Sequence, residues 1–247
     1  MDTIYDKIGV GYSVRRCTDP EIACQLNSAL QGATRIVNIG AGTGSYEPEN
    51  VELVAVEPST KMIAQRKAGS HRVEKAFAEK LPFDNNSFSH AMTVLSMHHW
   101  ENRELAFNEI NRVVTDKFVA ITWDPMSVPF WLTRDYFPEI YDMDKRIFPK
   151  LDELGEHFDD VSMRPLQIPS DCKDGFLAAF WKRPEAYLRS DIRQSISPFS
   201  KIGNLLEGLE KLKKDLISGV WVKNNRAILG ASSLDVGYTI ISAKVRN

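Results

Sequence analysis

IVNIGAGTGSY, residues 36–46, is the stretch that decides the fold, because a run of apolar residues leads directly into three glycines at alternate positions. Such a run is typical of a buried strand, and glycine permits a tight turn at its end. Ligands of open α/β sheets bind at the carboxyl ends of strands, where backbone N–H groups can approach them. We therefore expect a nucleotide-like ligand at Gly40, Gly42 and Gly44.

The spacing of these glycines separates the turn from two common nucleotide-binding loops. A dinucleotide fingerprint, G-x-G-x-x-G, counted from Gly40 would place its third glycine at Ser45. A phosphate-binding P-loop is excluded because the turn has no G-K-[ST]. Only SYEPEN, residues 45–50, precedes the next strand, which is too short for the long helix that usually receives a pyrophosphate. The turn therefore favours a ligand without phosphates.

A carboxylate follows the turn at the end of the next predicted strand, VELVAVE at 51–57. Glu57 at this position can accept hydrogen bonds from both hydroxyls of a ribose, and it would repel a 2′-phosphate. It could equally cap the helix that begins near Ser59. With the glycine turn upstream, ribose binding is the favoured interpretation.

Strand and helix patterns alternate on both sides of the turn. A helix opens at Pro20 behind Asp19, a residue that commonly caps helices. Alternating elements of these lengths predict parallel βαβ units and hence a doubly wound α/β sheet. The predicted strands are 35–40, 51–57, 72–77, 88–95 and 118–123, and the predicted helices are 20–30, 59–69 and a segment from 102 to 114.

The second half of the chain does not continue the alternation of strands and helices. Residues 126–150 are aromatic and punctuated by prolines, and helices are predicted at 173–194 and 204–220. VGYTIISAKV, residues 236–245, alternates as a final strand does. Because that strand needs the sheet as a partner, we expect helices added onto one end of the same sheet and no separate domain.

The composition argues against several classes of protein. Hydrophobic residues make up 43% and charged residues 26% of the chain, as in ordinary globular proteins. The formal net charge of −2 argues against a nucleic-acid or membrane partner. Residues 1–16 lack the apolar run of a signal peptide, and no apolar run is long enough for a membrane span. We expect a cytoplasmic protein whose three cysteines are reduced.

Four blocks carry a family resemblance when they are taken in order. They are IVNIGAGTG at 36–44, VAVEPS at 54–59, AEKLPFDNNSFSHAMTVLSMHHW at 78–100 and EINRVV at 109–114. Together they resemble the class I S-adenosylmethionine-dependent methyltransferases, and more narrowly the small-molecule group called methyltransferase type 11 or UbiE-like. FWLTRDYFPEI, DCKDGFLAAFWKRPEAYL and DVGYTI in the second half also resemble one branch of that group.

The resemblance implies a Rossmann-like methyltransferase fold, a seven-stranded, mostly parallel sheet whose last strand is antiparallel. It implies one domain over residues 1–247, made of N-terminal lid helices (1–33), a cofactor-binding core (34–125) and substrate-cover helices with the last strands (126–247). The residues that it assigns to S-adenosylmethionine are Gly40, Ala41 and Gly42 at the methionine and ribose portion, Glu57 at the ribose, Pro58 and Met62 near the adenine, Ala78 and Glu79 at the adenine edge, Leu95 and Ser96 beside the methionine, and Tyr12 closing over the cofactor.

Two positions depart from the family pattern. The first strand usually carries an acid where this chain has Asn38, so contact with the cofactor's ammonium must come from neutral groups or from elsewhere. The adenine loop often has an aspartate where this chain has Phe77, which can stack on adenine but loses one hydrogen bond. These changes weaken affinity modestly and leave the site in place.

Methyl transfer is an in-line displacement at a carbon activated by its sulfonium neighbour, so orientation can supply about 7–11 kcal/mol of the barrier. A general base is needed only for a weakly acidic acceptor. His98 and His99, just after the fourth strand, are the candidates. Local packing beside Trp100 is the simpler role for His99, and the two roles are balanced for His98. Adjacent histidines rarely converge on one ion, so we expect no metal there.

Other side chains have weaker assignments. Asp124 could face the acceptor, although a turn before Pro125 explains it better. Arg15 and Arg16 are interpreted as a solvated pair, with a smaller chance that one binds an acidic substrate group. Aromatic residues of the second half are the expected walls for an apolar or aromatic acceptor. They are Trp131, Tyr136, Phe176, Phe180 and Trp181.

The sequence thus favours an enzyme, monomeric or homodimeric, that methylates oxygen, nitrogen or carbon of a small molecule. An RNA or protein methyltransferase is the alternative within enzymes, against which stand the balanced charge and the lack of an N-P-P-Y-type motif. A non-catalytic module that binds S-adenosylmethionine is the alternative outside enzymes, and Asn38 and Phe77 keep it open.

Overall fold

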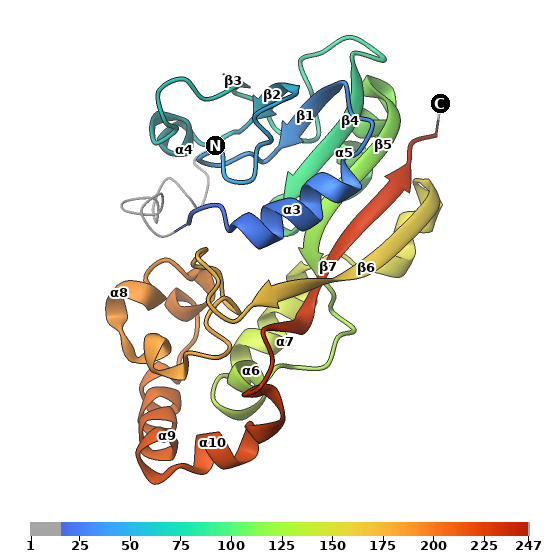
Figure 1. The fold of residues 1–247 in the computed structure, drawn as a ribbon. Helices are drawn as coiled ribbons and strands as arrows, with labels where there is room; N and C mark the ends of the chain where they lie inside the picture. The colour runs from blue at the N-terminus through green and yellow to red at the C-terminus, as the bar shows by residue number, and fades with distance from the viewer. Residues whose placement is uncertain (1–15, 247) are drawn as a thin grey trace.

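A computed structural model describes residues 16–246, and its centre is a seven-stranded sheet in the order β3-β2-β1-β4-β5-β7-β6 (Figure 1). The pairs from β3 to β5 are parallel, and β7 is antiparallel to both of its neighbours. The predicted doubly wound sheet with an antiparallel last strand is therefore confirmed. The strands are β1 (Arg35–Ile39), β2 (Glu52–Val56), β3 (Arg72–Glu74), β4 (Phe88–Val94), β5 (Val114–Trp123), β6 (Asp159–Pro169) and β7 (Ser233–Lys244).

Each face of the sheet has its own hydrophobic core, because alternate side chains of a strand point to opposite faces. Ile36 of β1 belongs to the core beneath α3 (Pro20–Ala29), and its neighbour Val37 belongs to the core beneath α5 (Arg103–Val113). Helix α3 begins where the sequence predicts, since the Asp19 carboxylate accepts hydrogen bonds from the first backbone N–H groups of the helix.

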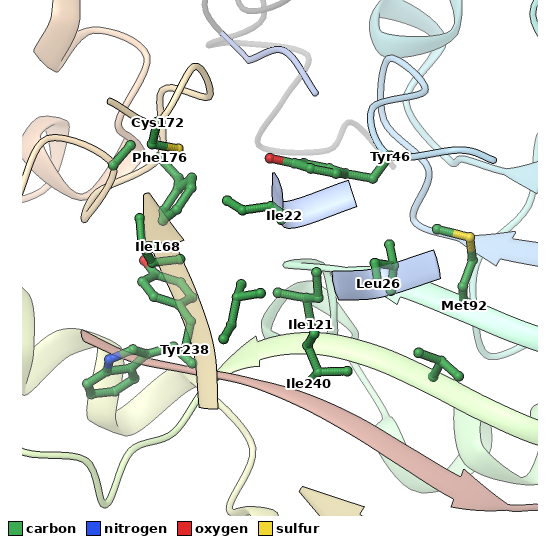
Figure 2. Packing of buried hydrophobic residues seen from close by; sticks show 14 of the residues in the cluster. Ile22, Leu26, Tyr46, Met92, Ile121, Ile168, Cys172, Phe176, Tyr238 and Ile240 are labelled. Atoms are coloured by element: carbon green, nitrogen blue, oxygen red, sulfur yellow. The ribbon is translucent and has the colours of Figure 1, made fainter. Parts of the chain in front are cut away.

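Figure 2 shows the core beneath α3. Ile22 and Leu26 of the helix face Ile121 and Ile240, which come from the neighbouring strands β5 and β7. Tyr46, from the loop after the glycine turn, and residues of the second half close the same cluster. This core therefore joins the glycine turn, the sheet and the cover.

The second half forms a cover beyond the carboxyl end of β5 and the start of β7 (Figure 1). Its aromatic residues pack among themselves in a third core, in which Trp131 contacts Tyr187 and Trp221 edge to face. The helices of the cover are α6 (Trp131–Asp135), α7 (Pro138–Ile147), α8 (Ser190–Arg193), α9 (Leu205–Ser218) and α10 (Val220–Asn224). The predicted helix at 204–220 is α9, which ends at Gly219 in a left-handed conformation.

Two predicted helices differ from the structure. The helix predicted at 173–194 is wrong: the segment contains turns, a 3-10 helix at Pro184–Leu188 and the single turn of α8. The Asp174 side chain accepts a hydrogen bond from the next backbone N–H, and Pro184 cannot donate one, so a continuous helix fails. Helix α4 (Thr60–Ala64) ends well before Gly69, and Ser59 caps its start as predicted.

Strand β6 is absent from the predicted strands. Most side chains in its first half are exposed and show no alternation of burial, because it lies at the edge of the sheet. It also contains Pro165 and ends at Pro169, residues that an edge strand tolerates and a central strand does not. Among residues 16–246, no helix has the length and apolar character required to cross a membrane.

Candidate active site

A cavity of about 430 Å³ opens at the carboxyl ends of β1, β2 and β4. Every predicted cofactor residue that the structure describes lines it. These are Gly40, Ala41, Gly42, Glu57, Pro58, Met62, Ala78, Glu79, Leu95 and Ser96. Tyr12 lies outside the described residues. The sequence motifs therefore converge on one cavity, which we call the cofactor pocket.

The glycine turn forms the floor of this pocket. Gly40 and Gly42 both have positive φ, at 69° and 53°, which glycine adopts without strain. A Cβ atom on Gly40 would lie 2.6 Å from the Cβ of Ser96, so a side chain has no room there. Ser96 itself is fixed by Thr93, whose hydroxyl is 2.6 Å from the Ser96 hydroxyl. The turn thus offers a concave surface of backbone.

Glu57 connects this turn to the residue that caps the next helix. Its Oε2 accepts a hydrogen bond of 2.8 Å from the backbone N–H of Gly42, and its Oε1 accepts one of 2.8 Å from that of Ser59. The side chain is only 5% exposed. The N-cap of α4 is Ser59, so the capping interpretation holds only as a contact with the backbone N–H of that cap residue, and the ribose interpretation stays a prediction. The two are compatible, because each carboxylate oxygen can accept more than one hydrogen bond.

A buried ionic cluster lies beneath the turn where the family's acid is missing. Asn38 donates from Nδ2 to Oε1 of Glu47 over 3.0 Å, and Arg66 donates to Oε2 of the same carboxylate over 2.7 Å. Glu47 lies in the SYEPEN segment, which the sequence analysis treated only as a spacer. Its negative charge stands beside Asn38 without occupying the strand position. No sequence signal other than an acid close to the turn could have identified it.

Asn38 and Leu95 show two further features of the pocket. Oδ1 of Asn38 is buried and has no hydrogen-bond partner among residues 16–246. Leu95, directly after β4, has a φ of 52°, which is a strained conformation for a bulky residue, and its N–H donates to the carbonyl of Ile121. Strained backbone of this kind concentrates at functional sites.

Phe77 and Glu79 line the part of the pocket where the resemblance implies that adenine binds. The Phe77 side chain is 43% exposed and lines the cavity, so its ring is available for stacking. Glu79 accepts a hydrogen bond from the backbone N–H of Asn102 and thereby connects this loop to the start of α5. Phe77, which departs from the family pattern, and Glu79 both line the cofactor pocket, and their contact with adenine stays a prediction.

A second cavity, of about 70 Å³, adjoins the first and shares four lining residues with it: Arg16, Leu95, His98 and His99. We call it the inner cavity. Its other walls come from the cover, including α7, and from Tyr238 of β7. His98 is stacked on Phe148 with ring centroids 4.1 Å apart. His98 and His99 therefore stand at the junction of the two cavities.

Burial keeps both histidines neutral. Desolvation, reinforced by His99 and by Lys201, lowers the pKa of His98 well below its ordinary value. Desolvation and Lys201 lower the pKa of His99 to about 4. Nδ1 of His98 is buried without a partner among the described residues. Residues 16–246 contain no cluster of side chains able to hold a metal ion, and the histidine pair is no exception.

The interpretation of Arg16 as a solvated residue is wrong. The Arg16 side chain forms a 2.8 Å ion pair with Asp174, a cover residue that is almost fully buried. The Tyr46 hydroxyl donates to the same carboxylate over 2.9 Å. This network connects the cover to the segment before α3 and to the loop of the glycine turn. A pairing between residues so distant in sequence leaves no local signal.

The predicted aromatic walls are mostly wrong. Trp131 and Trp181 are buried in the protein's cores, where the Trp131 indole donates to the Trp181 carbonyl, and Tyr136 packs beside them. Of the five aromatic residues, only Phe176 lines either cavity described above. Asp124 forms the expected turn, since its side chain accepts a 2.8 Å hydrogen bond from the N–H of Met126.

Comparison with known proteins identifies the family. The sequence profile of the methyltransferase domain matches residues 37–118. A solved structure from Anabaena variabilis, provisionally described as a methyltransferase from an antibiotic biosynthesis pathway, is 31% identical. Its alignment covers 92% of this chain and 98% of that one, with a TM-score of 0.83. The chain belongs to the S-adenosylmethionine-dependent methyltransferases.

This methyltransferase is also similar to 2-methyl-6-phytyl-1,4-hydroquinone methyltransferase 2, chloroplastic, of Oryza sativa subsp. japonica, with 28% identity over 144 residues. That match covers 54% of this chain and only 40% of the length of the rice protein. A geranyl diphosphate C-methyltransferase of Streptomyces coelicolor, solved with S-adenosyl-L-homocysteine, is 15% identical and has a TM-score of 0.51. The alignment covers 91% of this chain and 75% of that one, and the likeness shows the fold alone.

The cofactor pocket of this methyltransferase fits S-adenosylmethionine, the cofactor of the family. The unpartnered Oδ1 of Asn38 can accept a hydrogen bond from the methionine ammonium. The Gly40–Gly42 turn lines the pocket with residues that carry little or no side chain, which permits close approach of a ligand to the backbone. The Glu57 carboxylate can accept further hydrogen bonds from ribose hydroxyls. When bound, the cofactor supplies an electrophilic methyl group.

Proposed function

We propose that this methyltransferase acts on a small-molecule acceptor that occupies the inner cavity and meets the cofactor at His98. The observation that carries the proposal is the sharing of Arg16, Leu95, His98 and His99 by the two cavities. An acceptor that fills the inner cavity lies directly beside the cofactor pocket. Its enclosure by α7 and the cover favours a small molecule over a folded RNA or protein.

The proposed cofactor contacts divide among the elements of the pocket. The Gly40–Gly42 turn and Ser96 face the methionine and ribose portion, and Glu57 accepts the ribose hydroxyls. Pro58, Met62, Ala78 and Glu79 surround the adenine, and Leu95 flanks the methionine. Their common location on one cavity wall supports this assignment.

We further propose that His98 contacts the acceptor and accepts its proton. The neutral imidazole keeps a lone pair at physiological pH, because burial lowers its pKa. The lowered pKa also makes His98 a weak base. It therefore suits an acceptor with an acidic proton, or one that loses its proton after the bond to the methyl carbon has begun to form. The expected cytoplasmic location and the monomer or homodimer remain predictions.

Two measurements test the proposed function. Titration calorimetry with S-adenosylhomocysteine and with NAD should show binding of the first alone, and tight binding of NAD alone would contradict the proposal. Radioactive methyl transfer from S-adenosylmethionine should then be measured on phenols, amines and acids. Transfer to small acceptors is expected, and transfer only to RNA or protein would overturn the acceptor class.

His98→Gln tests the proton-accepting role separately. Glutamine keeps a polar side chain at the junction and cannot take up a proton, so kcat should fall while the affinity for S-adenosylhomocysteine is retained. Glu104→Gln, at an exposed position of α5 outside the lining of both cavities, is the control and should leave kcat nearly unchanged. A His98→Gln enzyme with unchanged kcat for every acceptor would remove His98 from the chemistry.

A further inference from the structure

One carboxylate of the inner cavity occupies a position where the fold calls for an apolar side chain. Helix α7 buries two residues, Ile140 and Asp144, one turn apart on the same face. Asp144 is 9% exposed, and it lines the inner cavity. An acidic side chain on the buried stripe of a helix is costly, so a specific role must justify its presence.

Asp144 has no partner of its own. Among residues 16–246, no donor forms a hydrogen bond or an ion pair with its carboxylate, although buried carboxylates normally have several. Among the described residues, the cation that acts on Asp144 is Lys201, whose side chain is exposed and acts only through its field. Arg16, the other cation that lines the cavity, is engaged by Asp174.

The remaining titratable groups that face the cavity are neutral. Burial lowers the pKa values of His98 and His99, and burial together with Asp144 raises that of Tyr238. Burial also raises the pKa of Asp144 to about 7, against an ordinary value of 3.8. The protein therefore presents a carboxyl group that changes charge near neutrality and that no described side chain neutralises by contact.

The walls around this carboxyl group are aromatic. His98 stacks on Phe148, and Phe176 meets Tyr238 edge to face with ring centroids 5.0 Å apart. All four rings line the inner cavity. Aromatic faces attract a cation that lacks its hydration shell, and they offer nothing comparable to an anion. A carboxylate enclosed by aromatic rings is the ordinary chemistry for binding an ammonium group.

We propose that the inner cavity selects acceptors that carry a basic nitrogen, and that Asp144 pairs with the protonated nitrogen to anchor the acceptor while its other end lies at His98. This inference rests on the proposed function, and it deepens that function by naming the class of acceptor. Asp144 is a binding residue in this account: it fixes the acceptor and takes no part in forming the new bond.

A series of ligands with one carbon skeleton tests the charge requirement. Phenethylamine, 2-phenylethanol and phenylacetate should be titrated calorimetrically into the protein saturated with S-adenosylhomocysteine, and methylammonium and benzylamine extend the series to shorter amines. We expect the amines to bind at least 10-fold more tightly than the alcohol and the acid. Equal or tighter binding of the alcohol or the acid, or no binding of any amine, would overturn the proposal.

Asp144→Asn removes the charge and keeps the shape of the side chain. It should abolish the preference for amines, whereas Asp142→Asn, on the exposed side of the same helix, should retain it. Near pH 6 the wild type should release close to one proton when an amine binds, because the ammonium forces Asp144 to ionise. Calorimetric titrations in buffers of different ionisation enthalpy measure the number of protons released on binding. Asp144→Asn should release none.

The two proposals fail in different ways. A protein that binds S-adenosylhomocysteine and prefers the alcohol contradicts the ammonium anchor and leaves the proposed function standing. A protein that binds amines through Asp144 and does not bind S-adenosylhomocysteine contradicts the proposed function alone. An unchanged preference for amines in Asp144→Asn would show that the aromatic walls act without the carboxylate, which also overturns the role of Asp144.

Discussion

The two cavities of this methyltransferase are built in opposite ways. Apart from Arg16, the lining of the cofactor pocket falls within residues 38–101, at the ends of neighbouring strands. The lining of the inner cavity is drawn from segments between Arg16 and Tyr238, which only the tertiary fold brings together. The first is therefore a property of local motifs, and the second is a property of how the cover sits on the sheet.

Their acidic groups differ in the same way. Both oxygens of Glu57 in the cofactor pocket accept backbone hydrogen bonds, so this carboxylate is fixed before any ligand binds. Asp144 in the inner cavity accepts no such hydrogen bond among the described residues, so its carboxyl group can pair with a ligand. The acidic group of the cofactor pocket is thus held in place before the cofactor binds. The acidic group of the inner cavity would gain its partner only when the acceptor binds.

The largest expected effect comes from breaking the link between the two regions. Asp174→Asn removes the charge that pairs with Arg16 and that accepts the Tyr46 hydroxyl. Loss of one partner of a buried ion pair should lower the free energy of unfolding by about 3–5 kcal/mol. Urea denaturation measures this loss. Asp171→Asn, an exposed residue of the same loop, is the control, and equal stability of the two variants would refute a structural role for the pair.

The second effect concerns pH and Asp144. Because the folded-state pKa of about 7 exceeds the ordinary 3.8, the folded protein holds this proton more tightly than the unfolded chain between these values. Wild-type stability should therefore fall, relative to Asp144→Asn, as the pH rises from 4 to 7, by up to about 4 kcal/mol. Denaturation at several pH values measures the difference, from which the contributions of His98 and His99 cancel. A difference independent of pH would contradict the buried, ionising carboxyl group.

The third effect concerns the glycine turn. Gly40→Ala places a methyl group against Ser96 at a positive φ, so we expect the variant to lose roughly 2–4 kcal/mol of stability and to bind S-adenosylhomocysteine poorly. Thermal unfolding and calorimetry measure the two consequences. Gly155→Ala is the matched control, since a Cβ there meets no neighbouring atom. A stable Gly40→Ala variant with normal affinity would show that the turn tolerates a side chain.

Glu57→Gln should have a smaller and more selective effect. Glutamine retains one acceptor oxygen but brings an N–H₂ group against backbone donors and loses the charge, so the affinity for S-adenosylhomocysteine should fall by about 1–3 kcal/mol. Titration calorimetry measures it. Glu52→Gln, at the exposed start of the same strand, should bind as the wild type does. Unchanged affinity in Glu57→Gln would remove Glu57 from the cofactor site.

The smallest effect is expected at Phe77. Truncation to alanine removes a half-exposed ring from the adenine end, and the affinity for S-adenosylhomocysteine should fall by about 0.5–1 kcal/mol. Phe77→Tyr keeps the ring and should change nothing. If both substitutions have the same effect in calorimetric titration, the ring does not stack on adenine.

The features that were predictable from the sequence are local. The glycine turn, the Asp19 and Ser59 caps and the five parallel strands each leave a contiguous pattern, because short runs of residues determine turns, caps and buried strands. Gly40, Gly42 and Glu57 of the cofactor pocket were predictable for the same reason, whereas its other predicted residues came from the family resemblance. These three residues follow strand ends, and parallel strands bring their carboxyl ends to one edge.

The features that escaped prediction depend on distant pairings. Glu47 pairs with Arg66, and Asp174 pairs with Arg16, so the role of each acid depends on a distant residue. The edge strand β6 likewise forms only by pairing with β7. No helix was predicted around Asp144, and only the folded structure places this residue on the buried side of α7. Aromatic residues of the second half suggested a substrate wall, yet most of them form a core, because a cover of short helices needs a core of its own.

The separation of the two sites is the central claim, and one crossed titration tests it most directly. S-adenosylhomocysteine and phenethylamine should each be titrated into the wild type, Glu57→Gln and Asp144→Asn. We expect Glu57→Gln to lower the affinity for S-adenosylhomocysteine and to leave the affinity for the amine unchanged. Asp144→Asn should do the reverse. The division into a cofactor pocket and an acceptor cavity is wrong if either substitution lowers the affinity for both ligands equally. It is also wrong if Asp144→Asn lowers only the affinity for S-adenosylhomocysteine.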